Sequence, residues 1–196
     1  MILVTEEPKM SKLAIFLADG FEEIEGLTVV DICRRCRLTI DTVSIKDTKE
    51  VISSHGIPLQ TDLLLSELDF DAYDILILPG GLKGTNNLEA CEPLKEAVRD
   101  FVAKDKYIAA ICAAPSIFGH MGLLQGKKAT SYPTFESHLE GAEVTGAGVT
   151  RDGRIITGRS MAYSVPFALT IAEIFAGKET AEKVASDIVY TGSFGG

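Results

Sequence analysis

A single thiol stands where a predicted buried strand meets a predicted helix, in the segment KYIAAICAAPSIFGHMG (106–122). The apolar run 107–111 leads directly into Cys112, and Pro115 opens a stretch with helical spacing. The partial positive charge and free N–H groups at a helix N-terminus favour a thiolate over a thiol. A sharp strand-to-helix turn also lifts its side chain out of the sheet, as in hydrolases. Cys112 is therefore a candidate nucleophile, with a buried structural cysteine as the alternative.

Acidic residues follow another predicted strand, in the segment ADGFEEIE (18–25). Beside an incipient thiolate, one glutamate would be held protonated, because two close negative charges disfavour one another. Such a carboxyl group can donate a hydrogen bond to sulfur and shuttle protons. Spacing alone does not choose among Glu22, Glu23 and Glu25, and most acids in the first turn of a helix are simply solvated.

Two adjacent glycines, Gly80 and Gly81, follow the apolar run DILILP (74–79). Bare backbone at such a strand end can approach a ligand closely and donate N–H groups to an oxyanion. A plain turn is the alternative interpretation. Ligands of open α/β sheets bind outside the carboxyl ends of the strands, so these glycines, the acidic segment and Cys112 are expected at one edge of the sheet.

A second cysteine pattern, Cys33-x-x-Cys36, falls late in a predicted amphipathic helix. A redox pair usually sits at a helix N-terminus, and a zinc site needs a second close pair of ligands. Neither Cys91 nor Cys112 has a cysteine or histidine at that spacing. We therefore predict no metal site, and we expect one thiol of the pair in the core and the other near the surface.

The elements that must position these residues alternate between strand and helix. Apolar runs predict strands and amphipathic spacing predicts helices, which implies βαβ units and a mainly parallel sheet with helices on both faces. Hairpins are predicted at 50–62 and 148–159, around His55-Gly56 and Asp152-Gly153, and two helices close the chain. We predict a single α/β domain over 12–196 after an N-terminal extension, 1–11.

The net charge, the lengths of the apolar runs and the N-terminal segment argue against several classes of function. The 196 residues carry a formal net charge of −9, which argues against nucleic acid or an anionic membrane surface as a partner. No apolar run approaches the roughly 20 residues that span a bilayer. The N-terminus lacks the basic and apolar regions of a signal peptide, so we expect a cytoplasmic protein.

Five blocks, in order along residues 11–190, resemble the ThiJ/PfpI superfamily, and more narrowly the branch of the parkinsonism-associated deglycase and its bacterial relatives. The blocks are FLADGFEEIE, LPGG with GTNNL, IAAICAAP, ATSYP and FALTIAEIFAGKETAEKVA. The resemblance implies a flavodoxin-like three-layer α/β sandwich, usually a homodimer. It implies Cys112 as nucleophile and Glu25 as its protonated partner. The backbone N–H groups of Gly81 and Ala113 would form the oxyanion site, with Gly80 beside them.

The same resemblance implies an activity. Family members convert methylglyoxal or glyoxal to hydroxy acids without a cofactor, and repair of early glycation adducts is reported. Small carbonyl compounds or glycated side chains are then the expected substrates. The alternative is an oxidative-stress sensor or chaperone in which Cys112 is oxidised to a sulfinate, since thiolate character drives both addition and oxidation. Some bacterial relatives also carry a label for thiazole monophosphate biosynthesis.

The sequence departs from the pattern of the family at three places. Tyr132 stands where several relatives have a histidine, so a relay from cysteine to histidine through this position is absent. Its phenol is a hydrogen-bond donor rather than a base near neutrality, and we expect it to contact the substrate. Ala113 follows the nucleophile where the protease-like branch has histidine, which argues against a peptidase. A peptidase or amidotransferase-like hydrolase would also need a general base near the elbow, and the sequence offers none there. Arg159 keeps its place, as a substrate contact or an ion-pair partner, but the segment 161–163 is bulkier than the Gly-Pro-Gly turn of many relatives.

Two histidines remain downstream of the predicted nucleophile. We interpret His120 as part of the packing of a helix and His138 as a surface residue. Neither is expected to act as a base, so Glu25 would have to carry the proton transfers.

Overall fold

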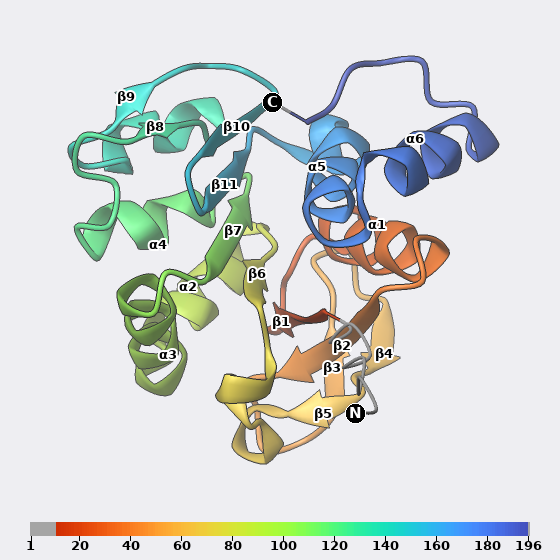
Figure 1. Ribbon diagram of the computed structural model, residues 1–196. Coiled ribbons are helices and arrows are strands. Elements are labelled where there is room, and N and C mark those ends of the chain that lie inside the picture. The colour runs from red at the N-terminus through yellow and green to blue at the C-terminus, as the bar shows by residue number, and fades with distance from the viewer. Residues whose placement is uncertain (1–10, 196) are drawn as a thin grey trace, which may run out of the picture.

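The computed structural model describes residues 11–195 and forms a central seven-stranded sheet between two layers of helices (Figure 1). The strand order is β10-β11-β7-β6-β1-β2-β5, and every pairing is parallel except that of β10 with β11. The strands are β1 (Lys12–Leu17), β2 (Thr39–Ser44), β5 (Leu63–Leu64), β6 (Ile75–Leu78), β7 (Tyr107–Ile111), β10 (Val149–Asp152) and β11 (Ile155–Gly158). The predicted flavodoxin-like sandwich is confirmed.

Helices cover both faces of the sheet. One layer holds α1 (Glu23–Arg35), α5 (Ser164–Ala176) and α6 (Lys178–Asp187); the other holds α2 (Leu82–Ala90), α3 (Glu92–Ala103) and α4 (Pro115–His120) (Figure 1). Strand β1 shows why both faces are apolar. Leu13 and Ile15 belong to one core cluster, whereas Ala14 and Phe16 belong to the other. Successive side chains of a strand point to opposite faces, so a strand covered on both sides is apolar throughout.

Both predicted hairpins form. The segment 50–62 makes a separate two-stranded sheet of β3 (Glu50–Ile52) and β4 (Pro58–Gln60), and 148–159 supplies β10 and β11 to the main sheet. A second small sheet pairs β8 (Lys128–Ala129) with β9 (Glu143–Val144).

Helix α2 was not predicted, because glycine and two asparagines lower its helix propensity. A tertiary contact explains why this segment is nevertheless helical. A Cβ at Gly84 would lie 2.6 Å from the Phe21 Cα, so the helix is held directly against the backbone that follows β1.

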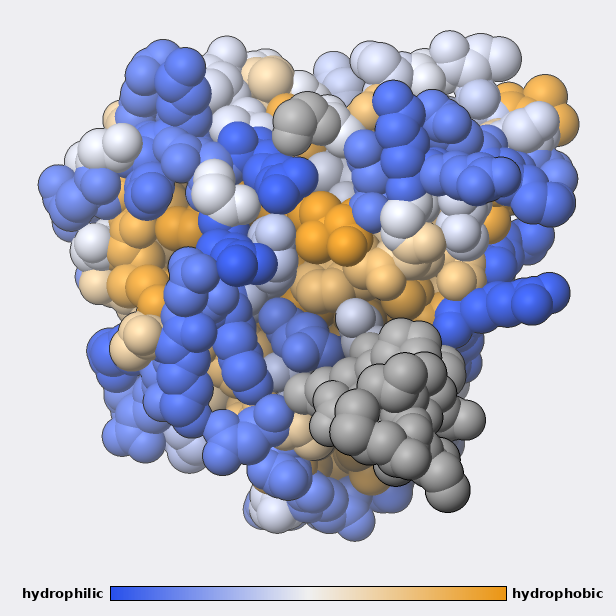
Figure 2. Space-filling model, viewed as in Figure 1, coloured by the Kyte–Doolittle hydropathy of each residue, from blue (hydrophilic) through white to orange (hydrophobic). Residues whose placement is uncertain are grey.

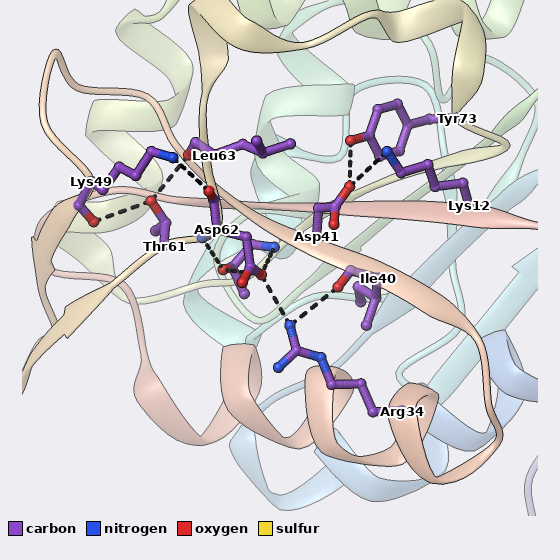
Figure 3. A network of polar contacts seen from close by, with 10 residues as sticks. Lys12, Arg34, Ile40, Asp41, Lys49, Thr61, Asp62, Leu63 and Tyr73 are labelled. Atoms are coloured by element: carbon purple, nitrogen blue, oxygen red, sulfur yellow. Dashed lines mark hydrogen bonds and ion pairs between the residues drawn. The ribbon is translucent and has the colours of Figure 1, made fainter.

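Polar contacts secure β2, the strand next to the edge strand β5 (Figure 3). The Asp62 carboxylate accepts hydrogen bonds from the backbone N–H of Thr42 at 2.9 Å and from its hydroxyl at 2.7 Å, and it pairs with Arg34 at 3.0 Å. On the same strand, Asp41 accepts a hydrogen bond from the hydroxyl of Tyr73 at 2.5 Å. These contacts tie the last turn of α1 and the start of β5 to β2.

The prediction for Cys33 and Cys36 is wrong in one respect, because both thiols are buried, with exposed fractions of 0 % and 4 %. The chain turns back after α1 through Arg37, at φ +60°, and this turn packs Cys36 into the same core cluster as Cys33. Burial raises the pKa of both thiols, which suits packing rather than redox chemistry.

The surface is mostly hydrophilic on the face drawn in Figure 2, with apolar areas exposed near its centre, between β7 and α5, and on its left side. Among residues 11–195, no helix has the length and apolar character that a bilayer crossing requires. The predicted extension 1–11 lies outside the described residues except for Ser11.

Candidate active site

The site is built on the turn between β7 and α4. Cys112 adopts φ +64°, in the left-handed region that residues with a Cβ rarely occupy. The surrounding backbone holds it there: the Cys112 N–H donates to the Gly158 carbonyl at 2.9 Å, and the Tyr132 N–H donates to the Cys112 carbonyl at 2.8 Å. Strain of this kind persists only where neighbouring structure enforces it, and it marks functional turns. The predicted strand-to-helix elbow is therefore present.

Glu25, in the first turn of α1, reaches this elbow from the end of β1, which is separated from β7 by β6. Its side chain is 1 % exposed, and its Oε2 accepts a hydrogen bond from the Gly80 N–H at 2.8 Å. The carboxyl group also interacts with the Cys112 thiol. Oε1 is buried and forms no hydrogen bond within the described residues.

Burial controls the protonation of the pair. It raises the pKa of Glu25 to about 7, although hydrogen bonds from Cys112 and Gly80 act in the opposite direction. Burial also raises the pKa of Cys112, and the adjacent Glu25 charge adds to the rise. The two groups therefore resist carrying two negative charges at once, and Glu25 exchanges its proton near neutrality.

The expected stabilisation of the thiolate by backbone N–H groups at the start of the helix is present, but burial outweighs it. The backbone N–H groups of Gly81 and Ala113 donate to Cys112 and oppose the rise in its pKa. Helix α4 is six residues long and begins three residues after the thiol, at Pro115, so its dipole acts weakly on the sulfur. Activation of Cys112 must therefore come through proton transfer to a base.

Gly80 separates the two side chains at close range. A Cβ there would lie 2.6 Å from both the Cys112 Cβ and the Glu25 Oε2, and 2.9 Å from the Ile111 carbonyl. Gly81 has φ +86°, and a Cβ there would lie 2.4 Å from the Gly20 carbonyl oxygen. A side chain at either position would collide with neighbouring atoms, so both positions require glycine.

The remaining acids of the motif face away from the thiol. The Glu23 carboxylate contacts the Ser54 hydroxyl at 2.9 Å and the His55 Nδ1 at 2.7 Å, and Glu22 contacts the same hydroxyl at 3.1 Å. These contacts with the β3–β4 hairpin leave Glu25 as the partner of Cys112, a choice that spacing could not make. Within residues 11–195, Glu22, Glu23 and His55 also form the one group of three side chains spaced to hold a metal ion, which sequence reasoning missed.

Tyr132 and Arg159 flank the elbow. Tyr132 is 44 % exposed, and its hydroxyl forms no hydrogen bond with the described residues. The Arg159 guanidinium pairs with Glu136 at 3.5 Å and donates to the Gly146 carbonyl. The ion-pair role expected for Arg159 is therefore present, and contact of either residue with substrate stays a prediction.

A cavity of about 390 Å³ lies next to Gly81 and is large enough for a small molecule. Its lining includes Gly20, Ser53, Ser54, Leu82 and Lys83.

A doubly wound α/β sandwich with a strained cysteine at a strand end, paired with a buried glutamate, defines a class of cysteine-centred flavodoxin-like proteins. The chain belongs to the DJ-1/PfpI family, whose model matches residues 11–174. It is similar to protein dj-1beta of Drosophila melanogaster, at 34 % identity over 92 % of this chain and 98 % of the fly protein.

Two further similarities bear on function. The solved structure of oxidized Toxoplasma gondii DJ-1 has a TM-score of 0.89 and 31 % identity, over 93 % of this chain and all of that one. An isonitrile hydratase of Pseudomonas putida is 32 % identical over 74 % of this chain and 63 % of its own. The family therefore includes enzymes.

The chain spans less than half of a plant relative, protein DJ-1 homolog B of Arabidopsis thaliana. That protein is 36 % identical over 96 % of this chain, which covers 43 % of the plant protein.

Proposed function

We propose that the protein is a cofactor-independent glyoxalase or deglycase that acts on methylglyoxal, glyoxal or early glycation adducts through Cys112 and Glu25. One observation carries the proposal: a strained thiol interacts directly with a buried carboxyl group whose pKa is raised to about 7. A group that exchanges a proton near neutrality suits general acid–base catalysis beside a nucleophile.

The chemistry follows from these two groups. With the Glu25 carboxylate as base, the Cys112 sulfur adds to the aldehyde carbon of methylglyoxal, and the transferred proton ends on the aldehyde oxygen to give a hemithioacetal. The carboxylate then removes the proton on that carbon, and the resulting enediol is protonated at the neighbouring carbon. The first carbon is oxidised to a thioester while the ketone is reduced to an alcohol. Water cleaves the thioester and releases lactate and the free thiol, so no external oxidant or reductant is consumed.

The backbone supplies the second element of catalysis. The N–H groups of Gly81 and Ala113, which donate to the sulfur in the resting site, are candidates to stabilise negative charge on the substrate oxygen. The preorganised turn keeps these donors in place, because Gly81 is confined by Gly20 and Ala113 is 3 % exposed.

Hydroxy-acid production from methylglyoxal, without glutathione, tests this function. We expect turnover by the wild type, a fall to background for Cys112→Ser, and a fall of about a hundredfold to ten-thousandfold for Glu25→Gln, the range of general acid–base catalysis. Cys91→Ser, at a half-buried thiol between α2 and α3, is the matched control and should retain activity.

The absence of wild-type turnover would contradict the proposal and favour a redox sensor. The partly exposed Cys112 also suits oxidation to a sulfinate, for which a protonated Glu25 is a hydrogen-bond donor. Peroxide titration followed by intact-mass measurement would then show oxidation in the wild type and none in Cys112→Ser.

We further propose that the chain forms a homodimer through an apolar surface at the start of α1 and the β3–β4 hairpin. Ile24 and Leu27 of α1, Ile52 and Ile57 of the hairpin, and Leu82 are each more than 40 % exposed. The hairpin is fixed to this end of α1 by the Ser54 contacts with Glu22 and Glu23. Sedimentation velocity should show a dimer that Ile24→Lys converts to monomer, whereas Val102→Lys, on α3, should leave it intact. A monomeric wild type would contradict the proposal.

A further inference from the structure

Glu89, His120 and His138, from three different elements, form a chain of hydrogen bonds, here called the histidine chain. His120 ends α4, and its Nδ1 lies 2.5 Å from an oxygen of Glu89 in α2. Its Nε2 lies 2.9 Å from the Nδ1 of His138, the last residue of the 3₁₀ helix η3 (Pro133–His138). His138 is exposed, as predicted, whereas His120 is exposed as well rather than packed inside, and tertiary structure brings the two rings together.

The donors and acceptors of this chain follow from elementary chemistry. An ionised carboxylate can only accept, so the Glu89 contact places a proton on the His120 Nδ1. A neutral imidazole has one N–H, so the His120 Nε2 is an acceptor and the His138 Nδ1 must donate to it. The ring centroids are 5.1 Å apart, as expected for two rings joined nitrogen to nitrogen along one line.

The histidine chain can accept one added proton without losing a hydrogen bond, but it cannot accept two. The first can bind the His138 Nε2, which takes no part in either hydrogen bond. A second would have to bind the His120 Nε2, where it would face the N–H of a His138 that is already charged. Two donors and two positive charges would then oppose each other, and the contact between α4 and η3 would open. Imidazoles change charge between about pH 5 and 8, so this event falls in an accessible range.

The histidine chain is connected to the nucleophile, Cys112, through the 3₁₀ helix η3. Tyr132 directly precedes η3, and its N–H donates to the Cys112 carbonyl. The two elements are in close backbone contact as well, since a Cβ at Gly119 would lie 2.0 Å from the His138 carbonyl oxygen. Movement of His138 away from α4 would therefore disturb the segment that holds Tyr132 against the elbow.

Other charged groups on the elements around the two histidines either form ion pairs or are exposed to solvent. In η3, Glu136 pairs with Arg159, and in α3 Glu92 pairs with Lys95. Glu140 is exposed just after η3. Glu89 is the carboxylate in direct contact with the pair of rings, through His120.

We propose that Glu89, His120 and His138 are positioning residues of this site: a proton-linked chain that fastens η3, and with it Tyr132, to α4 and releases it when a second proton binds. The consequence of this release for catalysis rests on the proposed function, but the hydrogen bonds of the histidine chain can be tested without substrate.

Imidazole nitrogen spectra of the ¹⁵N-labelled protein test the proton assignment directly, because the sequence has only three histidines. At pH 8 we expect His120 and His138 both as the Nδ1–H tautomer. The Nε2–H tautomer at either residue would overturn the proposal. Glu89→Leu should release His120 from this tautomer, whereas Glu89→Gln, which keeps an acceptor oxygen, should retain it.

Amide hydrogen exchange of Tyr132 tests the release. After correction for intrinsic rates, we expect exchange about tenfold faster at pH 5 than at pH 8, the size of effect expected for one charge-assisted hydrogen bond. His138→Phe should exchange fast at both pH values, and Ser137→Ala, on the same 3₁₀ helix, should behave as the wild type. Equal protection of Tyr132 at both pH values in the wild type would contradict the proposal, whether or not the protein turns over methylglyoxal.

Discussion

Gly80→Ala is expected to lower turnover of methylglyoxal at least about a hundredfold while the protein still folds. The added methyl group would lie 2.6 Å from both the Cys112 Cβ and the Glu25 Oε2, closer than real Cβ atoms approach other atoms. The two side chains must separate to accept it, and a displacement of about 1 Å at reacting groups costs on the order of a hundredfold in rate. The strain should also lower the free energy of unfolding by about 1–3 kcal/mol, the usual cost of overpacking.

Gly153→Ala separates damage to the site from loss of stability. Gly153 lies in the β10–β11 turn at φ +60°, and a Cβ there would have no neighbouring atom within 4 Å, so alanine strains the backbone without a clash. We expect lower stability by urea denaturation and unchanged turnover per folded molecule. If Gly80→Ala retained wild-type turnover, the tight contact among Gly80, Cys112 and Glu25 would not be needed for the reaction.

The second large effect is a dependence of stability on pH that belongs to Glu25. Its pKa is raised from 4.5 to about 7 in the folded protein, chiefly by burial. Between these values the unfolded chain releases the proton and the folded protein keeps it, so the free energy of unfolding falls as pH rises. At about 1.4 kcal/mol per pKa unit, the loss reaches about 3 kcal/mol by pH 7 to 8. It is absent below about pH 4.5, where both states are protonated.

Urea denaturation of the wild type and Glu25→Gln between pH 4.5 and 8 measures this contribution. The amide cannot ionise, so we expect the stability of the variant relative to the wild type to rise by about 3 kcal/mol across that range. Contributions from the other titrating groups cancel in the difference. Glu96→Gln, at an exposed position on α3, is the matched control for the loss of a carboxylate. Parallel curves for Glu25→Gln and the wild type would show that Glu25 is not buried as a protonated acid.

The pattern of the sequence predicted the alternating elements well, because both faces of the sheet are covered. Every residue of β1, β6 and β7 beyond the first is buried, and apolar runs of this kind are readable without a structure. The helix α3 was readable for a similar reason, with one apolar face and proline in its first turn. Helix α2 was not, because contact with the Phe21 backbone, rather than propensity, selects its conformation.

For the site, sequence alone determined which residues meet at the carboxyl edge of the sheet: Cys112, the glycine pair and an acidic segment all follow strands that lie side by side. Tertiary structure decided which acid reaches the thiol, because the β3–β4 hairpin engages Glu22 and Glu23 and leaves Glu25 buried. It also decided the protonation of the pair, since desolvation depends on atoms brought from distant parts of the chain. The joining of His120 to His138 has the same origin: side-chain contacts across 18 residues leave no periodic signal in the sequence.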